Sequence, residues 1–324
     1  MITKRNRENP SGKAQERRPR VLIWIAVAAF CLFVLIVMAM NSIKPEFLEL
    51  SRDDGDPKGA HFIGVNQALV MQMVANWLPN DLFWPTVLLD NMPNYQIGQL
   101  EVVRYNVRVL RDNLSRMRTT DKLDPYAEGA FTALSNDPYK WWFPSAESKW
   151  RLAYRNLDDF YRNLLAGQSQ FYPRADNLAE LLNQYASLMG GVNTRLINAP
   201  RDLKKTLSME ENRGEGGVES GLVSIDIPWH KIDDNFYYGQ GVAYALYESF
   251  RAIRIDFIDV LTDKNSVRLV DKILEDLRRC NFEPLIVFNG SPGSMFANHS
   301  LNLSGMFNDA RQKVNSLIVA LKQG

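Results

Sequence analysis

Residues that carry chemistry are scarce in this chain. Only three of its 324 residues are histidine and only two are cysteine. The spacings HExxH and CxxC, in which such residues bind zinc, do not occur. The chain also lacks a GxSxG nucleophile motif, and it has no SxxK motif with its partner elements. We therefore identify no reaction centre from motifs, and we expect no bound metal and no cofactor.

The two cysteines do not form a disulfide framework. Cys31 lies inside a long apolar run, whereas Cys280 lies in an amphipathic segment. Two such positions are not expected to pair within one molecule. A domain exported without disulfides depends on its hydrophobic core, and this chain is long enough to supply one.

A surplus of charge is missing as well. The chain has 38 basic and 37 acidic residues, which gives a net charge of +1. A nucleic-acid-binding protein usually has a basic patch, so nucleic acid is not an expected partner. The one basic cluster is the tail, residues 1–20, where seven basic residues stand against two acidic ones for a net +5. Anionic lipid headgroups explain such a cluster.

One long apolar run stands out against this background. Residues Val21–Met40 are twenty residues without a charge, a proline or a glycine. At a helical rise of 1.5 Å per residue, about 20 residues span the ~30 Å core of a bilayer. We therefore predict a transmembrane helix over residues 21–41, which makes the lipid bilayer the first expected partner.

The charges on the two flanks predict how this helix is oriented. A basic cluster beside a span stays in the cytoplasm, and the tail is that cluster. The other flank, Asn41–Lys58, carries five acidic residues and three basic ones. A cleaved signal peptide is the alternative, but its apolar run is usually 7–15 residues long and ends in small residues. This run is longer and ends Val37-Met38-Ala39-Met40-Asn41. We therefore expect a retained anchor with a cytoplasmic N-terminus and a periplasmic C-terminal domain.

Amphipathic helical patterns dominate the rest of the chain. Residues 42–60 are charged and rich in helix breakers, which predicts a juxtamembrane linker. Residues 61–200 predict one part of a helical bundle, because apolar residues recur three or four apart along most of this region. The strongest such run is Leu100–Met117. Ser145 and Asp176 are the expected N-caps of two further helices. The segment Asp81–Pro93 reads as a short helix on the membrane or as a turn that seals the core.

The pattern breaks once before the chain ends. Residues 201–221 contain four glycines and few large apolar side chains, which predicts a flexible loop. Residues 222–324 return to long amphipathic patterns, with one weak strand-like run at Leu222–Ile227. The predicted fold class is therefore mainly α, with one N-terminal transmembrane helix followed by an extracytoplasmic helical bundle.

The most suggestive polar cluster precedes a long helix. His230, Asp233, Asp234 and Tyr237 lie in the segment PWHKIDDNFYYGQG. A histidine with two nearby carboxylates can bind a metal or serve as an acid and base pair. The simpler interpretation is that one aspartate caps the helix and the aromatic residues anchor the turn. Further along, Glu248 and Arg251 are three residues apart and can pair on one face that is solvated or bridges the bundle. The alternative is that Arg251 and Arg254 pair with nearby aspartates inside the bundle.

Tryptophans concentrate in a second segment. Trp141, Trp142 and Trp150 lie within DPYKWWFPSAESKW. Tryptophan is favoured at membrane interfaces and at protein interfaces, so these residues are candidates for contact with a membrane or a partner. The other interpretation is a core plug between two helices.

These segments also carry a resemblance. The basic tail, the single span, WWFPSAESKW and IDDNFYYGQGVAYALYESFRAIRIDF resemble an uncharacterised family of single-pass inner-membrane proteins of Gram-negative bacteria, a domain of unknown function. The resemblance covers nearly the whole chain. It implies an inner-membrane location, and it assigns no activity and no catalytic residue.

Three functional hypotheses follow from the sequence. The first is a membrane-anchored scaffold or accessory binding subunit of an envelope assembly, with a protein partner there. The second is a periplasmic hydrolase or metal-dependent enzyme centred on His230, Asp233 and Asp234. The third is a sensor of small ligands, for which a sizeable apolar cavity in the bundle is the expected sign.

Overall fold

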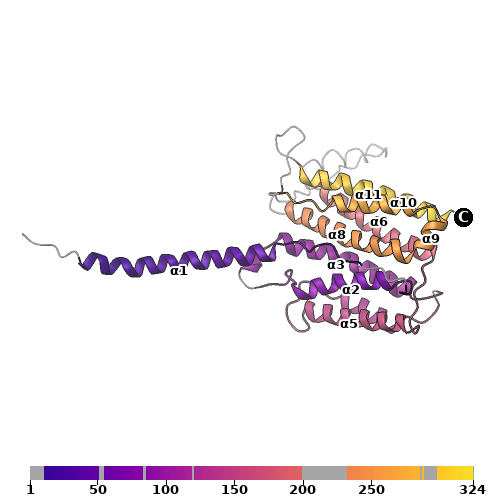
Figure 1. Cartoon of the computed structure of the whole chain (residues 1–324), viewed down its shortest axis with the longest axis horizontal. Coiled ribbons are helices and arrows are strands. Elements are labelled where there is room, and N and C mark those ends of the chain that lie inside the picture. The colour runs from indigo at the N-terminus through magenta and orange to yellow at the C-terminus, as the bar shows by residue number, and fades with distance from the viewer. Residues whose placement is uncertain are drawn as a thin grey trace, which may run out of the picture. The chain divides into compact units, whose positions relative to one another are not determined.

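The protein is mainly helical over the described chain, as the sequence predicted (Figure 1). The structure is a computed structural model, and it describes residues 11–50, 55–82, 85–118, 120–198, 232–284, 287 and 298–323. The predicted loop 201–221 and the strand-like run Leu222–Ile227 lie outside these residues. The helices are α1 (Ser11–Asn41), α2 (Ala60–Ala75), α3 (Asn91–Val109), α4 (Pro125–Leu134), α5 (Ala146–Leu165), α6 (Ala175–Asn198), α8 (Ile232–Asp256), α9 (Ile258–Asp263), α10 (Val267–Arg279) and α11 (His299–Lys322), with short turns η1 (Thr86–Leu88) and η2 (Leu110–Leu114).

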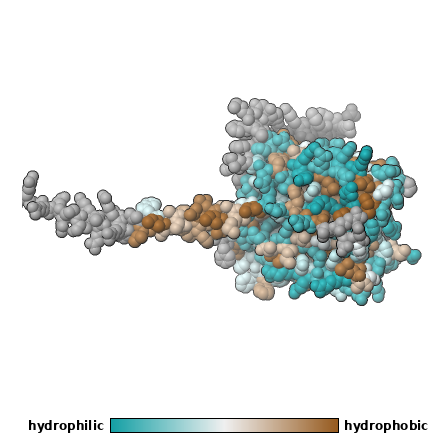
Figure 2. Space-filling model, viewed as in Figure 1, coloured by the Kyte–Doolittle hydropathy of each residue, from teal (hydrophilic) through white to brown (hydrophobic). Residues whose placement is uncertain are grey.

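The chain divides into two units. The first consists of residues 1–43 together with Leu82–Leu89, and within it η1 contacts α1. Residues Leu22–Asn41 of α1 have a mean hydropathy of 3.0, and none of this stretch is buried. It is the one described helix that is long and apolar enough to cross a membrane. Figure 2 shows the apolar residues gathered along α1 and a mostly hydrophilic surface on the second unit.

The second unit, residues 44–81 and 90–324, is a helical bundle built around α8. The helices α2, α3, α6, α10 and α11 all contact α8, and α5 packs on the outer side of α2 with α4 beside it. The closest approach is between α3 and α8, where Gly241 lies against the backbone of Tyr95 and Gly98 against that of Tyr238. Only glycine allows two helix backbones to come this near. Asn94 of α3 bonds to Asp234 near the start of α8, and Asn106 bonds to Ser249 further along both helices. The helices α3 and α8 therefore run parallel, with their N-termini at the same end.

A polar network sits in the middle of this apolar bundle. The buried amide of Asn106 donates to Asn66 Oδ1 at 2.9 Å and to Ser249 Oγ at 2.8 Å, and its oxygen accepts from the hydroxyl of Tyr185. The four residues come from α3, α2, α8 and α6. A buried polar network whose members are all satisfied favours one register over others. We infer that it fixes how these four helices align.

Helix ends follow capping chemistry, with two departures from the sequence expectation. Ser145 caps α5 through Ser148 N, as predicted, whereas Asp124 caps α4. The predicted cap at Asp176 is wrong, because α6 already begins at Ala175 and Asp176 lies within its first turn. The long helix predicted to Met117 ends sooner, in the π-helical turn η2, which leaves Met117 exposed.

Part of the predicted linker 42–60 is not a free connection. Residues 44–50, the strap, lie along α8: Lys44 Nζ donates to Gln240 Oε1 at 2.8 Å, Tyr244 donates to Glu46 O at 2.8 Å, and Leu48 N donates to Glu248 Oε1 at 3.0 Å. Phe47 packs on Tyr244 and Tyr247. The strap was missed because a short charged segment carries no periodic signal, and its partners lie about 200 residues further along the chain.

Candidate functional site

The start of α8 holds the polar residues that the sequence singled out. Asp233 and Asp234 lie in the first turn, since α8 begins at Ile232, and Tyr237 follows one turn later. His230 lies outside the described residues. Asp233 and Asp234 therefore occupy the positive end of the helix dipole, where a carboxylate is stabilised.

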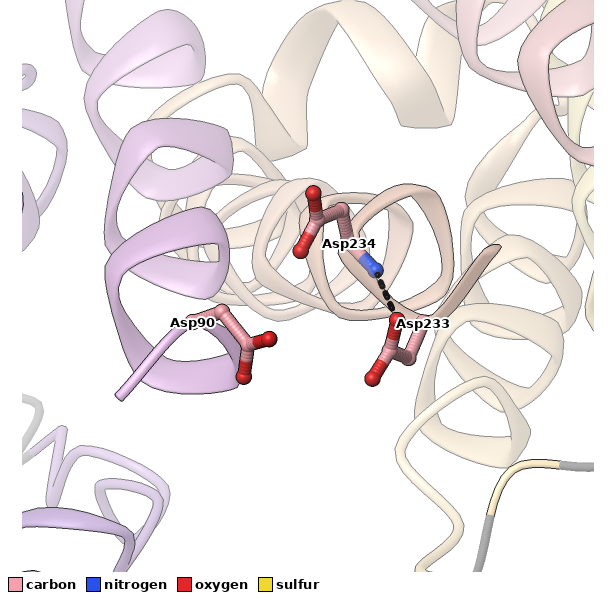
Figure 3. Close-up of side chains that lie close together, drawn as sticks. All are labelled: Asp90, Asp233 and Asp234. Atoms are coloured by element: carbon pink, nitrogen blue, oxygen red, sulfur yellow. Dashed lines mark hydrogen bonds between the residues drawn. The ribbon is translucent and has the colours of Figure 1, made fainter. Parts of the chain in front are cut away.

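A third carboxylate joins them from the neighbouring helix. Asp90, the residue before α3, offers an oxygen within 4.8 Å of those of Asp233 and Asp234. Figure 3 shows Asp90 beside the first turn of α3, facing the two aspartates of α8. Sequence reasoning missed Asp90 because it is remote in the chain, and the only local sign is its position before a helix.

Two of the three carboxylates accept hydrogen bonds from the described residues around them. Asp233 Oδ1 accepts from Asp234 N at 3.2 Å, and Asp234 Oδ1 accepts from Asn94 Nδ2 at 2.9 Å (Figure 3 draws the first). Asp90 is exposed to solvent. Clustered carboxylate oxygens are what divalent cations such as Mg²⁺ and Ca²⁺ prefer. The hydrogen bonds here, however, account for the cluster as the shared start of two neighbouring helices.

Tyr237 lies close to both this acidic cluster and the half-buried Lys44. Burial raises the pKa of Tyr237, and the negative charges of Asp233, Glu283 and Asp90 raise it further. The ammonium of Lys44 lies 5.5 Å from the centre of the Tyr237 ring and 3.6 Å from Glu283. Burial lowers the pKa of Lys44, an effect that Glu283 partly opposes. Tyr237 therefore stays protonated and can donate a hydrogen bond, which makes it unsuited to act as a base.

The three predicted interface tryptophans fall into two environments. Trp141 and Trp142 are 52% and 68% exposed, and their rings meet edge to face with centroids 5.1 Å apart. Trp150, in contrast, is 0% exposed and packs against Trp77 at 5.4 Å. The interpretation of Trp150 as a membrane-facing or partner-facing residue is thus wrong, because its position on the apolar stripe of α5 directs it into the core.

The structure adds a buried pair at the opposite end of α8. His61 Nδ1 lies 3.1 Å from Asp256 Oδ1, and Asp256 Oδ2 accepts from Phe62 N at 2.7 Å. Both side chains are buried. Burial raises the pKa of Asp256, although Phe62 N, His61 and Gly59 N oppose that rise. Asp256 thereby caps α2 from another helix. Sequence reasoning missed the pair because its members are 195 residues apart.

His61 also borders a cleft of about 250 Å³, together with Leu50, Asp56, Gly64 and Tyr161. Its Nε2 atom is buried and has no hydrogen-bond partner within the described part of the chain. The volume lies below the ~300–1,000 Å³ of typical small-molecule pockets. A second cleft, of about 290 Å³, lies between Glu101, Arg104 and Phe131. Neither is the sizeable apolar cavity that a ligand sensor would be expected to have.

Glu248 and Arg251 form the predicted pair, with the carboxylate inside the bundle. Glu248 is fully buried, accepts from Leu48 N, and pairs with Arg251 at 2.8 Å. Arg251 also donates to Leu48 O. Burial raises the pKa of Glu248, while Leu48 N and Arg251 lower it. The pair therefore holds the strap to α8, so it has a structural role.

Comparison with known proteins identifies a family. The profile of the family DUF2333, described as an uncharacterized protein conserved in bacteria, matches residues 22–324. The match covers all but the first 21 residues, so the chain belongs to this bacterial family. No curated protein and no solved structure matches the chain. The resemblance drawn from the sequence is confirmed at the level of a bacterial family with no assigned function.

Proposed function

We propose that this DUF2333 protein is anchored in the bacterial inner membrane by α1 and that its bundle works in the periplasm, by binding, as a scaffold or accessory subunit of an envelope assembly. The observation that carries the proposal is the apolar stretch Leu22–Asn41, none of which is buried. Leaving large apolar side chains in water costs about 1.5–3 kcal/mol each relative to burial, which a bilayer removes.

Retention of the helix is supported by its length and by the family match. Twenty residues suffice to span a bilayer, whereas signal peptides have shorter apolar runs. The match to the family begins at Leu22, so the apolar stretch belongs to the sequence that the family shares. A basic tail of net +5 before the helix supports a cytoplasmic N-terminus.

A binding role is supported by what the polar residues do. Asp233 accepts from Asp234 N within α8, and Asp234 accepts from Asn94 of α3. Glu248 holds the strap, and Asp256 caps α2. These engagements favour binding over the hydrolase or metal-dependent enzyme that the sequence also allowed. The bundle has a mostly hydrophilic surface that can be presented to other proteins (Figure 2).

The first of two measurements tests the anchoring. Alkaline carbonate extraction of membranes should leave the chain in the pellet at its full mass of 37.1 kDa. A soluble product shorter by the N-terminal segment would contradict anchoring.

Crosslinking in cells, followed by identification of captured proteins, tests the binding role. The matched control replaces residues 22–41 with an unrelated span of equal length. We expect both versions to capture the same envelope proteins, because the bundle and not the span makes the contact. Reproducible recovery of this chain alone would count against a scaffold.

A further inference from the structure

One loop of the bundle exposes several large aromatic side chains together. The aromatic loop, residues 137–144, contains Trp141 and Trp142, described above, and Phe143, which is 90% exposed. Tyr139 in the same loop is also exposed. A soluble surface rarely shows such a group, and groups of this kind mark interaction sites.

The backbone of this loop is firmly held. Trp77 Nε1 donates to Pro138 O at 2.9 Å, Asn80 Nδ2 donates to Lys140 O at 3.3 Å, and Ala146 N donates to the same oxygen at 2.8 Å. Just before the loop, Arg104 donates to Asn136 O at 2.7 Å. These hydrogen bonds fix the loop backbone in a conformation that leaves the aromatic rings exposed.

Contacts place the aromatic loop at one end of the bundle. Its braces Trp77 and Asn80 follow the end of α2, and Leu78 N donates to Gln96 Oε1 on the second turn of α3 at 2.9 Å. Near that turn, Tyr95 touches Gly241 of α8. Gln240, next to Gly241, accepts from Lys44. The aromatic loop and Lys44 therefore lie at the same end, where α3 and α8 begin. We call it the loop end.

The chain also connects to its apolar unit at the loop end. Lys44 follows Asn41, the last residue of α1, by three residues, which span at most about 10 Å. The segment Leu82–Leu89, which groups with α1, leaves the bundle after Asp81 and returns at Asp90, where α3 begins. Three connections between the bundle and the apolar unit thus arise at one end.

We propose that the aromatic loop is a second membrane contact, in which Trp141, Trp142 and Phe143 enter the headgroup region of the bilayer that α1 spans. The inference rests on the proposed anchoring, because a spanning α1 holds the loop end at the bilayer surface. The connections to the apolar unit at the same end favour lipid over a protein partner. The residue types fit lipid as well, because tryptophan and tyrosine concentrate at membrane interfaces and Lys140 can extend to phosphate groups.

The experiment uses a fluorophore that reports its environment. In a Cys31→Ser background, Trp142→Cys is labelled with nitrobenzoxadiazole and the full chain is reconstituted in phosphatidylcholine and phosphatidylglycerol vesicles. Cys280 can remain, because it is buried and burial raises the pKa of its thiol. Nitroxide lipids with the spin label near the headgroup then quench fluorophores that lie at that depth.

Met117→Cys is the matched control, because Met117 is 60% exposed and follows η2 at the other end of α3. We expect quenching at position 142 to exceed that at position 117 severalfold, with a blue-shifted emission at 142 only. Trp141→Cys should repeat the result. Equal quenching at 142 and 117, in protein that floats with the vesicles, overturns the inference alone. Protein that does not float with vesicles overturns the proposed anchoring instead.

Discussion

The two ends of the bundle differ in what they expose and what they hide. The loop end carries exposed aromatic side chains, three aspartates and the connections to the apolar unit. The far end, where α2 begins and α8 finishes, is held by the buried pair of His61 and Asp256. Exposed aromatic residues at one end and a buried pair at the other distinguish the loop end, the end for which we propose a membrane contact.

The two buried carboxylates of α8 hold segments that belong to the two different ends of the bundle. Glu248 holds the strap, which begins at the loop end, whereas Asp256 holds the start of α2 at the far end. Each accepts from a backbone N–H of a segment remote in sequence. One helix therefore fixes both the chain that comes from α1 and the helix that follows it.

The largest effect on stability is expected from a substitution that adds a methyl group between the closely packed helices α3 and α8. In Gly241→Ala, the new methyl group overlaps the carbonyl oxygen of Tyr95 and forces the helices apart. We expect a loss of about 4 kcal/mol or more in the free energy of unfolding, measured by denaturant titration. Gly305→Ala, where nothing lies within 4 Å, is the control and should gain about 0.5–1 kcal/mol. Equal effects at both positions would refute the close approach.

The far end can be broken through its buried carboxylate. Asp256→Ala removes the acceptor of Phe62 N and the partner of His61 Nδ1, leaving both groups buried. We expect a loss of about 2–4 kcal/mol in the free energy of unfolding. Asp271→Ala removes an exposed partner of Arg254 and should cost less than about 1 kcal/mol. A cost for Asp256→Ala no greater than this control would show that the far end is not held by the pair.

Glu248 predicts a dependence of stability on pH. Because burial raises its pKa, the folded protein holds this proton more tightly than the unfolded chain does. Its contribution to the free energy of unfolding therefore falls as pH rises from the unfolded value of about 4.3 to the raised folded value. Glu248→Gln should remove that fall, seen as the wild-type minus variant difference across pH 4 to 7. Glu275→Gln, at an exposed pair with Arg279, is the control, and identical profiles for all three proteins would contradict the prediction.

The smallest effect concerns the acidic cluster. Asp234→Ala removes an acceptor of Asn94 and a charge at the positive end of α8. We expect a loss of about 0.5–1 kcal/mol in the free energy of unfolding, measured by thermal denaturation. Asp309→Ala is the control, because it removes an aspartate from the middle of α11 and not from the start of a helix. A gain in stability on losing Asp234 would mean that repulsion within the cluster outweighs its hydrogen bonds.

Local pattern predicted the helices but not how the site residues meet. The spacing of apolar residues is a local signal, and it predicted α2, α3, α5, α6, α8, α10 and α11 because apolar residues recur three or four apart along each of them. Ser145 was found as a cap for the same reason. Asp90 lies beside Asp233 and Asp234, and Asp256 lies beside His61, only because helices that are distant in the sequence pack together. No pattern within a single helix encodes them.

The tryptophans show the same limit. Trp141, Trp142 and Trp150 are close in sequence and of one residue type, yet only Trp150 is buried. Trp141 and Trp142 lie in a loop whose backbone is held by Trp77 and Asn80, two residues that follow α2, whereas Trp150 lies in α5. The strap was missed for a related reason, because its structure depends on hydrogen bonds to α8 and not on any pattern within its own short sequence.

Anchoring with the bundle outside the cytoplasm is the central claim, and one measurement tests it most directly. A reporter enzyme active only outside the cytoplasm is fused in cells after Gly324 and, as a control, after Arg20. We predict activity for the fusion after Gly324, with the chain retained in the membrane, and silence for the fusion after Arg20. A silent reporter after Gly324 would contradict the proposed orientation.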